Sequence, residues 1–460
     1  MMTTGTAFLL ILWVGSHLAI VLTIRDSKFR LPVFAIIGLS LLVAYAMKPY
    51  TYDLKRYSIY FHTGFIETFG WHSPGGKFQL DGRDTTGEPF TQGFEPGFRL
   101  LAKAGNSLLP TGSLVPRFDP NVGDFEVRGP PRSDPMIFLV MLVGFIMLYS
   151  AAKHISHRKV NNPNDERLRM ITAGPIILGS VFFLLGSQNS LRQFLGVSII
   201  VLALSALSSR RYVICLVLVL LSAAFHKWAP ILGLIGVTVI LLGRLSINNP
   251  SRLQILRSPI VWVTSLLNLV TRGVIEKVFL QLYATGRFVP LPVKEICRLS
   301  SGETLSLMLG ITTIALIKGI SILGIFTMDI PLVGDLKPYL IMEDQYETIE
   351  RLGSFVKVGA IFVVFACSEF LLGRTSISGR IDIHSLRRMI FVFVIPLAVY
   401  PEIFSRLLIL YWAIELSFVV WGLSSSEKRP RMAAAVVFAA YGFAPNAINI
   451  LIGPRWFYNL

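Results

Sequence analysis

Long apolar runs separated by short polar connections dominate the chain. A helix needs about 17–25 apolar residues to cross the hydrocarbon core of a bilayer, and roughly twelve runs approach that length. They lie at approximately 5–24, 31–47, 136–152, 170–186, 193–208, 212–227, 229–243, 304–327, 354–373, 388–400, 407–423 and 433–453. Backbone at that depth must satisfy its own hydrogen bonds, which favours helices. We therefore predict an all-α fold, a polytopic integral membrane helical bundle that forms one domain over residues 1–460.

Composition supports a membrane protein and narrows its partners. Of the 460 residues, 53% are hydrophobic and only 15% are charged, whereas a soluble domain carries about 25% charged residues. The mean hydropathy is +0.62. The formal net charge of +16 fits the excess of Lys and Arg in the cytoplasmic loops of membrane proteins. We therefore expect membrane lipid as a partner and no nucleic acid. The first run is followed by IRDSKFR, a stop-transfer pattern, so we do not expect it to be a cleaved signal peptide.

The basic connections predict how the chain is oriented. All of them fit on the cytoplasmic side if both termini face outward, with the amphipathic segment 259–302 lying at the cytoplasmic interface. These connections are 25–30, 153–169, 209–211, 244–258, 374–388 and 425–431. The outer face then carries a long loop over 48–134, rich in Gly, Pro, Asp and aromatic residues, and a shorter acidic segment over 328–352. Loops as long as the first are usually functional or disordered.

The strongest candidate chemistry flanks two consecutive apolar runs in the middle of the chain. Arg192 opens the first run and His226 closes the second. Because two successive spans return the chain to its starting face, both residues are predicted on the same side of the membrane, where charged span ends are candidates for function. Arg binds phosphate oxygens bidentately, His can act as acid or base, and Gln188 and Gln193 extend the polar site. The alternatives are an Arg that snorkels to lipid headgroups and an interfacial His beside Trp228.

The segment YTYDLKRYSIYF stands at the start of the long outer loop. If it is helical, four side chains share one face at i, i+3, i+4 and i+7: Asp53, Arg56, Tyr57 and Tyr60. Aromatic rings stack on the apolar face of a sugar, while a carboxylate and a guanidinium bond its hydroxyls. This face therefore indicates sugar binding. The alternative is an interfacial helix, with its Tyr residues in the aromatic belt and an internal Asp–Arg pair.

A second motif in the loop, FEPGFRLL, combines a carboxylate with a helix start. If Pro96 begins a helix, Glu95 and Arg99 are spaced i, i+4, and Glu95 lies just before the first turn. A carboxylate at that place can cap the helix. It could equally serve as the general base that takes the proton of a sugar hydroxyl in glycosyl transfer.

Late in the chain, PEIFSRLLILY places Glu402 and Arg406 at i, i+4 near the outer end of a span. An Arg at this place could be a second clamp for a phosphate or an oxyanion, and the alternative is an ion pair within the helix. Four other arginines are interpreted as anchors at the inner face: Arg210, Arg211, Arg387 and Arg388. The chain has no GxxxxGK[ST], GxGxxG or HExxH fingerprint, which argues against an ATP-driven pump and an inner-face nucleotide-sugar transferase.

The order of these motifs resembles the EpsG/Wzy-like integral membrane polysaccharide polymerases of bacteria. The resembling segments span about residues 50–411: YDLKRYSIYF, FEPGFRLL with Gly97, SLRQFLGVSII, AAFHKWAPILG and FSRLLILYW with Tyr411. The resemblance implies a glycosyltransferase of the bacterial inner membrane that joins repeat units into O-antigen or exopolysaccharide. Such an enzyme works at the periplasmic face on undecaprenyl-pyrophosphate-linked oligosaccharides, with undecaprenyl pyrophosphate as the leaving group. A chain-length regulator protein can be a further partner.

The resemblance also implies a role for each candidate residue. Two arginines would bind the pyrophosphate, and one of two carboxylates or the His would activate the acceptor hydroxyl. The expected catalytic residues are Asp53, Glu95, His226, Arg192 and Arg406, and the expected substrate-binding residues are Arg56, Tyr57, Tyr60, Arg99, Gln188, Gln193, Glu402 and Tyr411. We expect no cofactor and find no good set of metal ligands.

Two other functions share most of these features. A flippase or transporter for lipid-linked oligosaccharides would have as many spans, but it should carry internal repeats and interrupted spans at matching positions, and the sequence has none that we detect. An O-antigen ligase or a polyprenyl-phosphate-sugar glycosyltransferase would share the arginine clamps. The products distinguish them, because a ligase moves a finished chain, a transferase adds one sugar and a polymerase makes a ladder.

Overall fold

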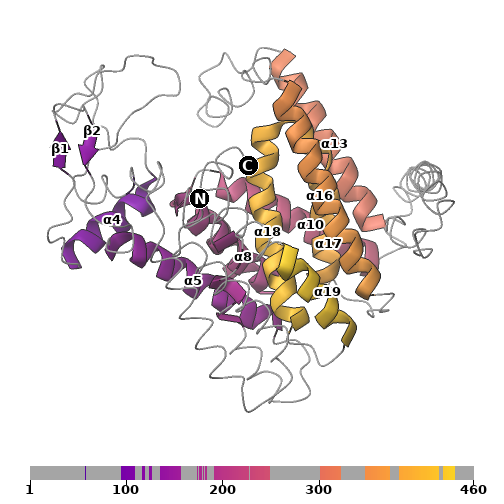
Figure 1. The fold of residues 1–460 in the computed structure, drawn as a ribbon, viewed down its shortest axis with the longest axis horizontal. Helices are drawn as coiled ribbons and strands as arrows, with labels where there is room; N and C mark the ends of the chain where they lie inside the picture. Colours follow the sequence, from indigo (N-terminus) through magenta and orange to yellow (C-terminus); the bar gives the residue numbers. More distant parts are fainter. Residues whose placement is uncertain are drawn as a thin grey trace, which may run out of the picture. The chain divides into compact units, whose positions relative to one another are not determined.

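The computed structural model describes part of the chain, and its elements fall into two compact units. The described residues are 57, 95–108, 117–119, 124–126, 135–156, 173–174, 176–178, 180, 182–183, 191–226, 228–248, 301–322, 348–372, 383–423 and 428–440. Unit 1 comprises Met1–Leu234 with Tyr441–Asn459, and unit 2 comprises Ile235–Ala440 with Leu460. Figure 1 labels the elements in the order in which they follow along the chain. Each unit is described by itself.

Unit 1 is built mainly of helices. They are α4 (Pro96–Leu108), α5 (Pro135–Ser156), α8 (Leu191–Ser208), α9 (Tyr212–Ala223) and the start of α10 (Ala229–Asn248). Helix α8 packs against α5 and α9, and α4 packs against α5. Strands β1 (Arg117–Asp119) and β2 (Asp124–Glu126) pair in antiparallel fashion, with Phe118 opposite Phe125. The predicted outer loop 48–134 therefore contains a helix and a short ribbon of its own.

The described helices have the character of a membrane protein. Three segments are long and apolar enough to cross a bilayer: Leu191–Ser208, Gly353–Leu372 and Ile403–Leu423. Shorter apolar helices occupy Leu139–Ala152, Tyr212–Ala223 and Ala229–Leu241. Apart from the β1–β2 ribbon, the elements that the structure describes are helical, in agreement with the predicted helical class. The predicted runs at 5–24 and 31–47 lie outside the described residues, so the total of about twelve spans stays a prediction.

Small residues allow the helices of unit 1 to approach closely. A Cβ atom added to Gly144 of α5 would lie 2.1 Å from Cε1 of the Phe194 ring of α8, which occupies that space. The same ring contacts Phe182 and Phe183, with centroid distances of 5.5 and 5.3 Å. Close approach at small residues is the usual way in which apolar helices gain packing contacts where lipid provides no hydrophobic drive between them.

The turn between α8 and α9 is a Schellman motif. The N–H of Arg210 donates to the Leu207 carbonyl and the N–H of Arg211 to the Ala206 carbonyl, both at 2.9 Å. Arg210 has a φ of 60°, the left-handed conformation that this motif requires at its penultimate position. At about 1.5 Å per residue, α8 spans roughly 27 Å. The exposed pair Arg210 and Arg211 thus lies at the opposite end of α8 from Arg192.

Within the described ranges, unit 2 contains the rest of α10 and five further α-helices. They are α13 (Ser301–Ile322), α16 (Thr348–Leu372), α17 (Ile383–Val394), α18 (Pro401–Leu423) and α19 (Lys428–Phe438), and the 3-10 turn η6 (Pro396–Val399) follows α17. Helix α17 packs against α13 and α18, and α19 packs against α16 and α18. The predicted single run at 388–400 is therefore broken into α17 and η6, since Pro396 cannot continue the α-helical hydrogen bonds.

Two predicted segments between these helices meet the described residues only in part. The acidic segment 328–352 ends inside α16, which begins at Thr348, and its remainder lies outside the described residues. The amphipathic segment 259–302 reaches them only at the first turn of α13. Its predicted place at the membrane interface therefore stays a prediction.

The left-handed Arg210 gives a direct test of the α8–α9 turn. Replacing Arg210 with Gly removes the steric cost of a side chain at positive φ and should stabilise the protein by about 1 kcal/mol. Arg211→Gly is the matched control, because Arg211 is equally exposed but has a φ of −90° and should gain nothing. Thermal unfolding of the purified protein in detergent measures both. Equal effects of the two substitutions would contradict the turn geometry.

Candidate functional site

An ion pair between α8 and the residue before α4 joins two of the predicted motifs. Nη1 of Arg192 lies 2.9 Å from Oε2 of Glu95, and Nε of Arg192 donates to the Tyr57 hydroxyl at 3.4 Å. The Arg192 side chain keeps 25% of its surface exposed and that of Glu95 keeps 11%. Three segments that are far apart in the sequence, 57, 95 and 192, therefore meet at the beginning of an apolar helix of membrane-spanning length.

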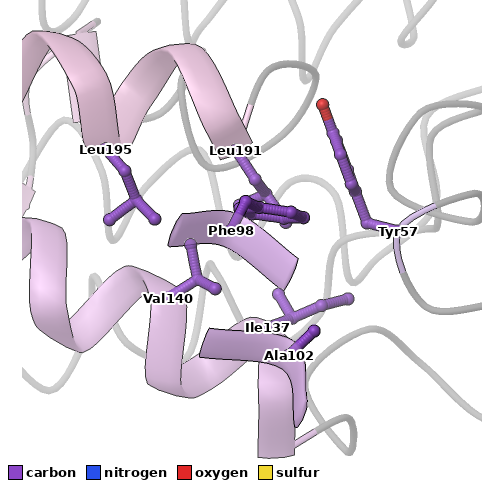
Figure 2. Close-up of a cluster of buried hydrophobic side chains, with 7 residues drawn as sticks. All are labelled: Tyr57, Phe98, Ala102, Ile137, Val140, Leu191 and Leu195. Carbon is purple, nitrogen blue, oxygen red and sulfur yellow. The ribbon is translucent and has the colours of Figure 1, made fainter. Parts of the chain in front are cut away.

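An apolar cluster, drawn in Figure 2, adjoins the ion pair through Tyr57 and Leu191. Its members are Tyr57, Phe98, Ala102, Ile137, Val140, Leu191 and Leu195. The rings of Tyr57 and Phe98 make an edge contact, with centroids 5.6 Å apart. Figure 2 shows Tyr57 at the margin of the cluster, with its hydroxyl directed away from the apolar side chains. The cluster holds α4, α5 and α8 together, so the polar groups above it are supported by a packed, dry base.

The start of α4 is fastened to the end of α9. The N–H groups of Gly97 and Phe98 both donate to the carbonyl oxygen of Ala224, at 2.7 and 3.2 Å. A Cβ atom on Gly97 would lie 2.7 Å from that oxygen, so only glycine permits the approach. The first N–H groups of a helix have no partner within the helix, and here the end of another helix satisfies two of them. Pro96 at the first position needs no partner, and Glu95 is held beside Arg192.

His226 lies in the turn that receives α4 and also contacts α8. A Cβ atom on Gly196 would lie 3.1 Å from Cβ of His226. Because Arg192 and Gly196 are four residues apart on α8, they share a helix face, which places His226 about one turn along from Arg192. Both therefore lie toward the same end of α8, as the sequence predicts. The imidazole is 7% exposed.

The tautomer of His226 follows from its backbone contact. Nδ1 accepts a hydrogen bond from the N–H of Trp228 at 3.3 Å. A ring nitrogen that accepts carries no proton, so the neutral imidazole has its proton on Nε2. In this arrangement Nε2 is a hydrogen-bond donor. His226 is thus suited to donate a hydrogen bond to an anion or a leaving oxygen.

The remaining predicted site residues are distributed as follows. Asp53, Arg56, Tyr60 and Gln188 lie outside the described residues. Arg99 is exposed on α4, and its N–H donates to the Glu95 carbonyl at 3.0 Å, which confirms that Pro96 begins a helix. Gln193 is buried in α8, and within the described ranges its Nε2 atom has no hydrogen-bond partner.

Three predicted residues belong to α18 in unit 2. Glu402 lies in its first turn, and Arg406 one turn later is half-buried. Tyr411 is fully buried and donates a hydrogen bond from its hydroxyl to Oε1 of Glu415. Its ring lies 5.6 Å from that of Phe391. In this conformation Tyr411 is part of an internal polar network and not of a surface that a sugar could reach.

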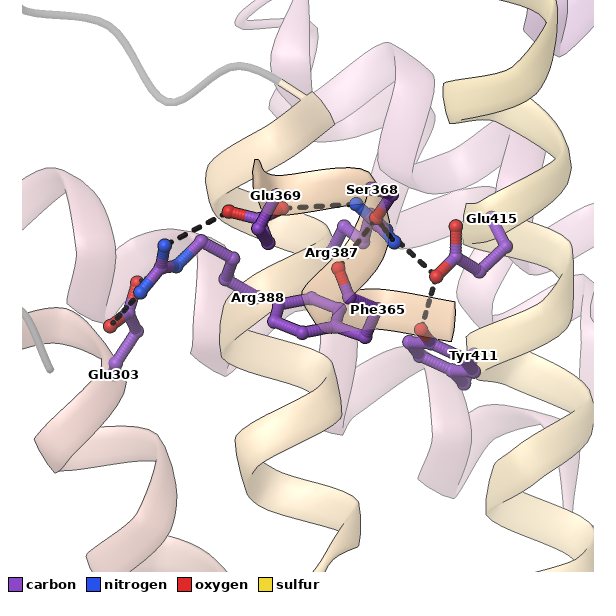
Figure 3. A network of polar contacts seen from close by, with 8 residues as sticks. All are labelled: Glu303, Phe365, Ser368, Glu369, Arg387, Arg388, Tyr411 and Glu415. Atoms are coloured by element: carbon purple, nitrogen blue, oxygen red, sulfur yellow. Dashed lines mark hydrogen bonds and ion pairs between the residues drawn. The ribbon is translucent and has the colours of Figure 1, made fainter. Parts of the chain in front are cut away.

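That internal network is a charged cluster that the sequence analysis missed (Figure 3). Arg387 has no exposed surface; its Nε donates to Glu415 at 2.7 Å and its Nη1 to Glu369 at 3.0 Å. Arg388 is bound by Glu303 at 2.6 Å and by Glu369 at 2.9 Å. The interpretation of Arg387 as an anchor at a membrane face is wrong, because it is completely buried. The sequence feature that could have revealed the internal partners of Arg387 is the presence of Glu369 and Glu415 inside apolar runs, because charges there require a partner.

The contact between α8 and the His226 turn can be tested through Gly196. Gly196→Ala should cost about 1–3 kcal/mol of stability, because its Cβ would lie 2.7 Å from Cβ of Ala229. Gly319→Ala in α13 is the control, since no atom of the described residues lies within 4 Å of a Cβ atom there. The control should gain about 0.5–1 kcal/mol from helix propensity. Thermal midpoints of both variants give the comparison. A Gly196→Ala protein as stable as the control would refute the close packing.

Neither comparisons with known proteins nor a search for metal ligands identifies a function for the protein. No family model, no curated protein and no solved structure matches the chain. Within the part of the chain that the structure describes, no three His, Cys, Asp or Glu side chains are grouped so that they could hold a metal ion. The function of the protein is therefore argued from two observations: the apolar helices, and the polar cluster of Arg192, Glu95, Tyr57 and His226.

Proposed function

We propose that this protein polymerises oligosaccharide repeat units that are linked to undecaprenyl pyrophosphate, at the periplasmic face of the bacterial inner membrane. The observation that carries the proposal is the convergence of a guanidinium, a carboxylate, a phenol and an imidazole at one end of a helix of membrane-spanning length. A lipid pyrophosphate and a sugar hydroxyl require an anion clamp and a base at the membrane surface, and this cluster offers both.

Arg192 is the proposed clamp for the pyrophosphate. Its planar fork matches two phosphate oxygens, and a quarter of its side chain is accessible. In the ligand-free state the guanidinium is neutralised by Glu95 at 2.9 Å. An incoming pyrophosphate, with its higher charge, competes for the same donors. As the glycosidic bond to the lipid breaks, the charge that develops on the leaving pyrophosphate is stabilised by donors already in position.

Glu95 is the proposed general base. Once the pyrophosphate has taken over the guanidinium, the carboxylate is released to accept the proton of the acceptor hydroxyl. The hydroxyl oxygen attacks the anomeric carbon, the bond from that carbon to the pyrophosphate oxygen breaks, and the leaving group keeps the electron pair. The Nε2–H group of His226 is proposed as a further hydrogen-bond donor to the same anion. Asp53 remains a second candidate base.

Arg406 is proposed as a second anion clamp because the resemblance to the EpsG/Wzy-like polymerases implies this role. The variant Arg406→Ala tests it. Arg56, Tyr57, Tyr60, Arg99, Gln188, Gln193 and Glu402 remain proposed contacts to the sugars or the pyrophosphate. The buried Gln193 amide supports this for one of them, because its Nε2 donor is unused among the described residues and lies next to Arg192 in the chain. A buried donor without a partner is costly and suggests a ligand or water that completes it.

The clamp is tested with Arg192→Ala in cells that lack the chromosomal copy. We expect the polysaccharide ladder to fall by about 10²–10³-fold, while single lipid-linked repeat units accumulate at the periplasmic face. Arg210→Ala, at the opposite end of α8, is the matched control and should leave the ladder unchanged. Arg192→Lys should restore it only in part, because Lys lacks the fork.

Each alternative function predicts a different product. Repeat units trapped at the cytoplasmic face would identify a flippase, a complete ladder that is not attached to its final acceptor would identify a ligase, and addition of one sugar would identify a simple transferase. A normal ladder in both Arg192→Ala and Arg406→Ala would rule out the arginine clamps.

The base is tested with Glu95→Gln. The amide keeps the size of the side chain and can still accept a hydrogen bond from Arg192, but it cannot take up a proton. We expect the polymerisation rate to fall by about 10²–10⁴-fold with little change in thermal stability. Tyr57→Phe is a graded comparison, because it removes one proposed contact, the hydroxyl that Arg192 contacts, but no base, and it should lower the rate by less than about tenfold. A Glu95→Gln enzyme with normal rate would move the base to Asp53 or His226.

A further inference from the structure

Within the described residues, one carboxylate of the charged cluster in unit 2, that of Glu415, has hydrogen-bond partners on only one of its two oxygens. Among the described residues, two guanidiniums, those of Arg387 and Arg388, are bonded to three carboxylates, those of Glu303, Glu369 and Glu415. Figure 3 shows the cluster running from α13 through α17 and α16 to α18. The Glu303, Glu369 and Glu415 side chains are 6%, 4% and 3% exposed. Water therefore does little to stabilise these carboxylates.

Within the described residues, one carboxylate oxygen of the cluster has no hydrogen-bond donor. Both oxygens of Glu303 accept from Arg388. The two oxygens of Glu369 are divided between the two arginines, with Oε1 on Arg387 and Oε2 on Arg388. In Glu415, Oε1 accepts from Arg387 and from the Tyr411 hydroxyl. Its Oε2 is buried and, within the described residues, has no hydrogen-bond partner.

An ionised carboxylate with one buried oxygen that lacks a hydrogen-bond donor has a high free-energy cost. Removing an ionised group from water is repaid only by excellent pairing and by hydrogen bonds to its remaining lone pairs. The other two carboxylates meet both conditions and Glu415 does not. One proton on Oε2 would convert the carboxylate into a neutral acid. Oε1 would keep its contacts with Arg387 and Tyr411.

We propose that Glu415 is a proton-binding site, occupied by a single proton on Oε2 at neutral pH. The step is a simple association of a carboxylate and a proton to give a carboxylic acid. Ionisation would leave a buried carboxylate oxygen without a hydrogen-bond donor where α16, α17 and α18 meet, so proton occupancy is coupled to the packing of these helices. The proposal is independent of the polymerase activity, because it rests on unit 2 alone.

The surroundings of Glu415 contribute few other charges. Helix α17 provides Arg387 by direct contact and Arg388 beyond it, α16 provides Glu369 and the Ser368 hydroxyl, and α13 provides Glu303, which reaches the cluster through Arg388. The rings of Phe365 and Phe418 cover the Arg387 guanidinium, 4.6 and 4.4 Å from its carbon.

The last two elements packed in this unit are η6 and α19. Turn η6 is apolar and is followed by the buried Tyr400. In α19, Lys428 and Arg429 are exposed and Arg431 is half-buried in the first turn. Gly422 of α18 packs beside Ala434 and Pro430, so that first turn lies near the end of α18 and about two turns beyond Glu415.

Infrared spectroscopy of the purified full chain in lipid nanodiscs tests the proposal directly. A protonated carboxylic acid has a carbonyl stretching band that a carboxylate lacks, and the band shifts on exchange into heavy water. We expect this band in the wild-type protein at neutral pH and its loss in Glu415→Gln. Absence of the band from the wild type, or its survival in Glu415→Gln, would overturn the proposal.

A pair of identical substitutions provides a second, independent measurement. Glu415→Gln replaces a neutral acid by a neutral amide of the same shape, so its thermal midpoint should stay within about 2 °C of the wild type. Glu369→Gln removes a carboxylate shared by two arginines and should lower the midpoint by roughly 5 °C or more. An equal loss in both variants would mean that Glu415 is ionised. A midpoint that rises with added sodium or potassium ions in the wild type but not in Glu415→Gln would assign the site to a cation instead.

Discussion

The requirement that charges among apolar helices be paired determines both polar centres of this protein. In unit 1, Arg192 and Glu95 form an ion pair at 2.9 Å at the beginning of an apolar helix. In unit 2, Arg387 is completely enclosed and is bonded to two carboxylates and sandwiched between two aromatic rings. The two centres differ in accessibility. A quarter of the Arg192 side chain is exposed, so an anion can compete for it, whereas Arg387 can only hold helices together.

Small residues at helix contacts determine where the paired charges lie. The carbonyl of Ala224 receives the first N–H groups of α4 only because Gly97 has no side chain. Gly196 lets the His226 turn approach α8 one helical turn from Arg192. These contacts involve backbone atoms, which cannot change rotamer. The polar groups are therefore positioned by the helix packing itself, and an enzyme that must stabilise a leaving anion gains from donors that are fixed in advance.

The helical class and the position of Arg192 and His226 toward the same end of α8 could be predicted from the sequence, because apolar run length and the return of the chain through two spans determine which ends meet. The helix start at Pro96 was predictable from proline geometry. The pairing of Glu95 with Arg192 was not, since it joins residues 97 positions apart. The burial of Arg387 was also missed, because hydropathy assigns an arginine at the edge of a run to the interface. Only Glu369 and Glu415, inside apolar runs, signalled that it had internal partners.

The most direct test of the central claim is reconstitution of the purified chain in liposomes with repeat units linked to undecaprenyl pyrophosphate. A polymerase should produce a ladder of longer lipid-linked glycans and release one undecaprenyl pyrophosphate for each glycosidic bond formed. Arg192→Ala protein in the same liposomes should produce neither. Movement of intact units across the bilayer without new glycosidic bonds would contradict the account and identify the protein as a transporter of the same substrates.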